Sequence, residues 1–101
     1  MSDTIETTYG SCIDLVVEHL ANGEPVDVSG DMFEIRDAVP SSLESDFVIA
    51  PVIGDPHKIS LHLDSDSARK LGFGRVNHFR LVRVDADGCE DSTRKLWIDV
   101  K

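Results

Sequence analysis

The sequence predicts a single α+β domain, in which one main N-terminal helix packs on a bent, mostly antiparallel sheet of five to six short strands. Two observations lead to this prediction: a helical spacing of apolar residues near the N-terminus, and a series of short alternating segments separated by glycine and proline turns. The composition, 41% hydrophobic and 29% charged over 101 residues, is that of one globular domain, residues 1–101. A partly closed barrel is the variant that the same pattern allows. Residues 1–10 are polar and are expected to form a loosely ordered arm.

The main helix is predicted from Ser11 to Asn22, with Gly23 ending it. Its apolar residues follow the i, i+3, i+4, i+7 spacing of a face packed on a core: Ile13, Val16, Val17 and Leu20. Leu15 points away from this stripe, so we expect either a partner or the N-terminal arm to cover it.

Short strands account for most of the remaining chain. Residues 25–28 and 32–38 are predicted to form a hairpin across a turn at Ser29-Gly30-Asp31. Residues 47–50 form a strand that Pro51 confines to an edge, a bulge or the strand's end. Three later segments, 58–63, 78–84 and 94–100, alternate apolar with polar residues or are rich in β-branched and aromatic ones.

A second short helix is predicted at residues 64–71, where Asp64 can cap the helix and Gly72 can end it. This unit, with the pattern DSxxARxLGF between two strands, resembles the corresponding piece of double-psi and swapped-hairpin β-barrels. The resemblance covers about a quarter of the chain and implies a strand, a capped helix and a second strand in succession. Val76-Asn77 stands where those barrels have Gly-Asp, and the unit has no second copy in this chain. The resemblance is therefore one of local turn chemistry.

The charge is the most informative feature of the composition. The chain carries a formal net charge of −9, and its first 35 residues contain eight acids and no Lys or Arg. Such a balance argues against generic binding to DNA or to an anionic membrane. Solubility explains the acids equally well, but a one-sided acidic segment also suits docking on a basic protein surface.

We therefore predict a small acidic regulator or inhibitor that docks on a basic, nucleic-acid-binding type of surface of a larger protein partner. Small phage-type inhibitors of defence machinery are analogous in charge and size only. Acids would raise the association rate, and an apolar anchor would slow dissociation. The predicted partner-binding residues are Asp14, Leu15, Glu18, Glu24, Asp27, Asp31 and Trp97.

An alternative function uses the basic window from Ser67 to Arg83, which contains no acid. Its cationic residues could bind an anion or a nucleic acid: Arg69, Lys70, Arg75, His78, Arg80 and Arg83. We expect most of them to pair with the protein's own acids, which makes direct nucleic-acid binding the less favoured prediction.

A small enzyme with a site assembled from distant residues is the second alternative, but no catalytic motif supports it, so the sequence predicts no enzyme. It also predicts no metal and no other cofactor. The longest apolar run, residues 47–53, is too short to span a membrane. Because residues 1–10 do not resemble a signal peptide, Cys12 and Cys89 are expected to be reduced and the protein to be cytoplasmic. A homodimer is compatible with the sequence.

Overall fold

The computed structural model, which describes residues 4–101, consists mainly of β-strands. Strands account for 56% of residues 4–101 and helices for 8%, so the predicted α+β class is wrong. The only helices in residues 4–101 are two single turns, α1 (Leu43–Asp46) and α2 (Ser65–Ala68).

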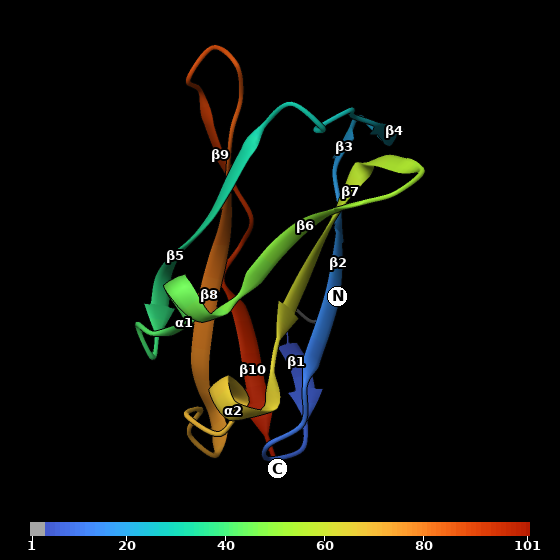
Figure 1. Ribbon diagram of the computed structural model, residues 1–101. Helices are drawn as coiled ribbons and strands as arrows, with labels where there is room; N and C mark the ends of the chain where they lie inside the picture. Colours follow the sequence, from blue (N-terminus) through green and yellow to red (C-terminus); the bar gives the residue numbers. More distant parts are fainter. Residues whose placement is uncertain (1–3) are drawn as a thin grey trace.

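The strands form two sheets and a separate hairpin (Figure 1). The five-stranded sheet contains β1 (Thr4–Thr7), β5 (Met32–Val39), β8 (Gly74–Val84), β9 (Glu90–Ser92) and β10 (Leu96–Val100), in the order β1-β10-β8-β5 with β9 beside β8. The three-stranded sheet has the order β2-β7-β6, with β2 (Ile13–Glu18), β6 (Val48–Val52) and β7 (Asp55–Leu63). The hairpin pairs β3 (Leu20–Ala21) with β4 (Glu24–Pro25).

The two sheets curl around one apolar core, with the three-stranded sheet in front in the view of Figure 1. Both sheets and both helices contribute fully buried side chains: Leu61 and Leu63 of β7, Phe79 and Leu81 of β8, Ile98 of β10, Leu43 of α1 and Ala68 of α2. Pairing is antiparallel except between β1 and β10, the first and last strands. Residues 4–7, part of the predicted arm, thus form β1, and Ile5 packs against the core.

The predicted main helix is strand β2, and this is the largest correction to the sequence analysis. Ile13 and Val17 belong to both a helical stripe and a two-residue repeat, so the apolar pattern alone is ambiguous. As a strand, the segment points Ile13, Leu15 and Val17 towards the core and leaves Val16 60% exposed. The β-branched residues of this segment favour a strand. Pairing of all six residues of β2 with residues Lys58 to Leu63 of β7 stabilises it.

The predicted hairpin between residues 25–28 and 32–38 is also wrong. Glu24–Pro25 pairs with β3, and β5 pairs with β8 across the five-stranded sheet. Asn22 and Gly23 both have positive φ angles, 53° and 80°, which is the type I′ turn of a two-residue hairpin. The Asn-Gly pair that we interpreted as a helix end is therefore a hairpin turn.

The unit around α2 confirms its predicted cap. The Asp64 side chain accepts a hydrogen bond from the Ser67 backbone N–H at 2.8 Å, although the helix ends at Ala68 and not at residue 71. Pro51 lies in β6, which pairs only with β7, and this confirms its predicted position at a sheet edge.

Candidate functional site

The predicted partner-binding residues lie in four separate regions of the molecule. Asp14 and Glu18 lie on the outer face of the three-stranded sheet, where each faces a histidine. Asp14 Oδ1 is 2.5 Å from His62 Nδ1, and Glu18 Oε2 is 3.3 Å from His57 Nε2. These two carboxylates are therefore engaged within the protein and stand apart from the other predicted acids.

The two predicted apolar anchors do not accompany Asp14 and Glu18. Leu15 lies opposite Leu61 in the β2–β7 pair and packs against the core. Trp97 lies on the outer face of the five-stranded sheet, where its ring meets the edge of His78 at 4.9 Å. Neither side chain shares a surface with the acids of β2.

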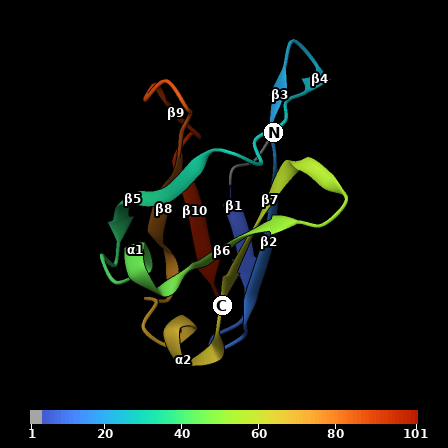
Figure 2. The same ribbon diagram turned by 45° about the horizontal axis from the view of Figure 1, so that its top comes forward.

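The remaining predicted acids, Glu24, Asp27 and Asp31, lie at one end of the molecule. The β3–β4 hairpin and the turn between β8 and β9 both project from this end in Figures 1 and 2. We call it the hairpin end and define it as residues 19–31, 53–54 and 85–92. The segments 19–31 and 85–92 contain no Lys or Arg. The second of them brings four acids that the sequence analysis did not include: Asp85, Asp87, Glu90 and Asp91.

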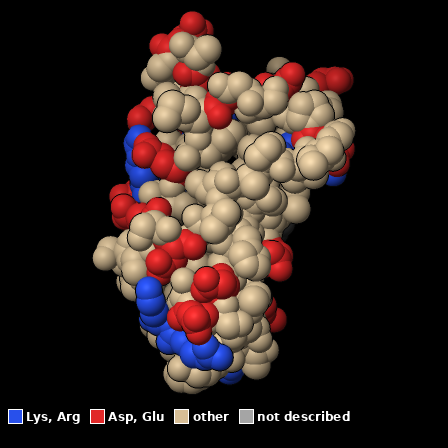
Figure 3. Space-filling model, viewed as in Figure 1, with Lys and Arg blue, Asp and Glu red and all other residues tan. Residues whose placement is uncertain are grey.

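In Figure 3 acidic atoms lie at the top of the molecule and over much of the rest of this face, and basic atoms lie beside them on both sides of the upper part. Some of these acids have partners within the protein. The side-chain hydroxyl and backbone N–H of Ser29 donate hydrogen bonds to Asp27 and lower the pKa of its carboxyl. Hydrogen bonds from Arg36 likewise lower the pKa of Glu90. These two carboxyls therefore stay ionised to a lower pH than free carboxyls do.

Exposed apolar side chains accompany the acids. Leu20 of β3 is 51% exposed, and Ile53, in the turn between β6 and β7, is 99% exposed. A hydrogen bond from Val28 N–H to Pro56 O, 2.8 Å, ties the acidic 26–31 loop to the segment that follows this turn. An isoleucine that contacts almost nothing in its own chain is a suitable anchor for a partner.

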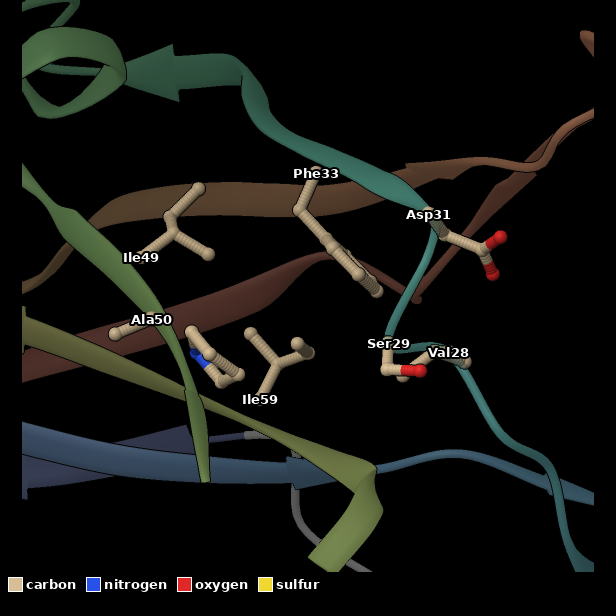
Figure 4. Close-up of a pocket in the computed structure, with 8 residues that line it drawn as sticks. Val28, Ser29, Asp31, Phe33, Ile49, Ala50 and Ile59 are labelled. Carbon is tan, nitrogen blue, oxygen red and sulfur yellow. The ribbon is translucent and has the colours of Figure 1, made fainter. Parts of the chain in front are cut away.

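A cavity of about 220 Å³ opens between the edges of β5 and β6 (Figure 4). Phe33, Ile49 and Ile59 point into this space, whereas the Asp31 carboxylate points away from it. Asp31 Oδ2 instead lies 3.5 Å from Arg83 Nε. Six of its eight lining residues are apolar, so the cavity could hold a small apolar side chain.

His19, the first residue of the hairpin end, lies edge-on to Phe33, with 5.3 Å between the ring centres. Its burial, and secondarily the charge of Arg83, lower the pKa of its imidazole. Its Nδ1 atom is buried and has no hydrogen-bond partner among residues 4–101. The site therefore favours the neutral form of His19.

The lowered pKa of His19 predicts acid sensitivity. Below about pH 6.5, His19 binds a proton in the unfolded chain, whereas in the folded protein it stays neutral down to its lowered pKa. The free energy of unfolding therefore decreases as the pH falls from about 6.5 through the folded pKa. We expect His19→Gln to reduce the fall in the free energy of unfolding between about pH 7.5 and about pH 5, measured by urea denaturation. An unchanged pH slope in this variant would contradict the prediction.

The basic window does not form one surface. Four of its bases pair with acids, which confirms the expected internal pairing: Arg69 with Asp66 at 2.7 Å, Lys70 with Asp46 at 3.3 Å, Arg80 with Asp37 at 3.7 Å, and Arg83 with Asp31 at 3.5 Å. Only Asp31 comes from the acidic first third of the chain. Arg75 and His78 lie beside Trp97 instead.

No group of three or more His, Cys, Asp or Glu side chains in residues 4–101 is placed to hold a metal ion. No helix in this range is long and apolar enough to cross a membrane. In comparisons with known proteins, no family model matches this sequence and no curated protein is similar to it.

Proposed function

We propose that the chain is a non-enzymatic regulator or inhibitor that docks through its hairpin end onto a basic surface of a larger protein. The observation that carries this proposal is the convergence of two acidic segments, far apart in sequence, with the fully exposed Ile53 at one end of a rigid β scaffold. The revised site keeps Glu24, Asp27 and Asp31 from the sequence prediction.

The chemistry of this end suits such docking. Its carboxylates would attract a basic partner and raise the association rate, while Ile53 and Leu20 would lose water on contact and slow dissociation. Basic surfaces of this kind are most extensive on nucleic-acid-binding proteins, so a bound inhibitor would compete with phosphates there. Two exposed free thiols, Cys12 and Cys89, fit the reducing cytoplasm as its location.

The proposal predicts that charge reversal at the hairpin end, and not elsewhere, abolishes binding. Wild-type and variant proteins would be immobilised, and partners captured from a lysate of the native host would be quantified. We expect Glu24→Lys/Asp91→Lys to reduce the captured partner at least about tenfold, because it replaces attraction with repulsion at the contact. Ile53→Ser should weaken capture without changing its salt dependence, because it removes only apolar contact.

The matched control is Asp14→Lys/Glu18→Lys, which raises the net charge from −9 by the same four charges on the outer face of the three-stranded sheet. This control should retain capture within about twofold. Equal losses in the two double variants would show that net charge alone governs capture, and the hairpin end would then be rejected as the docking site.

A further inference from the structure

The outer face of the five-stranded sheet carries a basic surface built around the chain's single tryptophan. We call it the Trp97 surface and define it as Trp97, His78, Arg75, Arg80 and Lys95. None of these five residues belongs to the hairpin end, although the acidic turn 85–88 that is paired with them below is part of it. Trp97 lies opposite His78 in the β8–β10 pair, and the flanking residues Leu96 and Ile98 pack against the core. The alternation of the strand therefore directs the indole outward.

The cations of this surface are weakly neutralised. The Arg75 guanidinium lies 5.5 Å and the Lys95 ammonium 5.4 Å from the centre of the Trp97 ring. The contact of Arg80 with Asp37 is long, 3.7 Å, and both side chains are substantially exposed. Exposed ion pairs of this kind hold charges only loosely, so the surface remains open to an external carboxylate.

An acidic turn follows the same strand. β8 carries His78 and Arg80 in its middle part and leads at Val84 into the turn Asp85–Gly88. The Asp85 side chain accepts hydrogen bonds from the backbone N–H groups of Asp87 and Cys89, both at 2.9 Å, and so fixes the turn. Asp87 is exposed on this projecting turn (Figure 1).

We propose that two copies of this chain form a closed two-fold dimer through the outer faces of their five-stranded sheets, with their β8 strands antiparallel. In this arrangement the acidic turn of each copy lies on the Trp97 surface of the other. Because the cations of β8 and the acidic turn lie on either side of Val82 along the chain, a two-fold axis near that residue forms each contact twice.

The dimensions of β8 suit this arrangement. A strand rises about 3.3 Å per residue, so His78 and Val84 lie about 20 Å apart along it. An axis near Val82 would therefore place residues 85–87 of one copy opposite residues 77–79 of the other. Met32, 73% exposed, lies opposite Val84 and would lose water near the axis. The two hairpin ends would point in opposite directions, which leaves Glu24 and Ile53 accessible.

Two variants test the dimer without removing any side-chain hydrogen bond or ion pair that the structure shows. Ala86→Lys/Asp87→Lys makes the turn basic, and Arg75→Glu/Lys95→Glu makes the Trp97 surface acidic. In a dimer made of either variant alone, like charges would face each other at both contacts. We therefore expect the dissociation constant of that dimer to rise at least about tenfold. Sedimentation velocity over a concentration series measures this constant, and Trp97 fluorescence should shift to shorter wavelength as the wild-type dimer forms.

Mixing the two variants is the decisive measurement. In the mixed dimer, the basic turn meets the acidic surface and the acidic turn meets the basic surface, so both contacts become attractive. We expect an equimolar mixture to form heterodimers with at least about the wild-type affinity. Matching thermal unfolding of the two variants and the wild type, each diluted to monomer, would show that folding is intact.

Three results would overturn the proposal: a wild-type protein that stays monomeric at about millimolar concentration, a dimer unaffected by either variant, or a mixture that forms no heterodimer. Quenching of Trp97 by a single-stranded oligonucleotide, without dimer formation, would assign the surface to nucleic acid instead. None of these outcomes depends on partner capture through Glu24 and Asp91, so this inference and the proposed function fail separately.

Discussion

Leu15→Asp is expected to lower the free energy of unfolding by about 2–4 kcal/mol, because it turns a carboxylate towards an apolar core. Leu15 lies opposite Leu61 in the β2–β7 pair and packs against the buried cluster. If the segment were the predicted helix, Leu15 would face away from the helix's core-packing side and the same change would cost little. Urea denaturation followed by circular dichroism measures the difference.

Val16→Asp is the matched control, because it introduces the same side chain one residue along the same strand. Val16 is 60% exposed on the outer face, so its replacement should cost about 0.5–1 kcal/mol, mainly through the low strand propensity of Asp. Similar losses in both variants would contradict the inward direction of Leu15. A larger loss for Val16→Asp would favour the helix.

Asn77→Ala is expected to cost about 2–3 kcal/mol, because this buried amide holds the loop between α2 and β8. Asn77 is 1% exposed. Its Oδ1 accepts a hydrogen bond from Gly72 N–H at 2.9 Å, and its Nδ2 donates to Gly72 O at 2.8 Å and to Ile98 O at 3.4 Å. Removal of the amide leaves these backbone groups without their partner.

Asn77→Asp separates the loss of the donor from the loss of volume. At neutral pH the introduced carboxylate can accept from Gly72 N–H but cannot donate, and its burial raises its pKa. A group with a raised folded pKa stabilises the protein below its unfolded pKa and loses that contribution as pH rises. We therefore expect Asn77→Asp to be less stable than Asn77→Ala at about pH 7 and to recover part of the difference at about pH 4. No recovery at low pH would argue against a buried carboxyl at this position.

Features set by neighbouring residues could be predicted from the sequence. The Asp64 cap follows from the side-chain oxygen beside the free amides of α2, and the inward direction of Leu96, Ile98 and Val100 follows from their strict alternation. The hairpin turn at Asn22-Gly23 could also have been predicted, since Asn-Gly strongly favours a type I′ turn. A hairpin interpretation there would have ended the predicted helix.

The candidate site could be predicted only in part, because sequence position does not give position in space. The five predicted partner-binding acids divide between the outer face of the three-stranded sheet and the hairpin end. Asp85, Asp87, Glu90 and Asp91, which follow the predicted strand 78–84 in the sequence, join three of them only after folding.

By itself the sequence determined the cap at Asp64 and the excess of acid in one third of the chain, and it limited Pro51 to an edge, a bulge or a strand's end. Only the tertiary structure decided whether residues 13–18 form helix or strand, because their pattern satisfies both periods and pairing with β7 supplies the deciding hydrogen bonds. It also decided which charges meet. Arg75 and Lys95 reach Trp97 because β8 and β10 are neighbours in the sheet, and such long-range pairing is not visible in the order of residues along the chain.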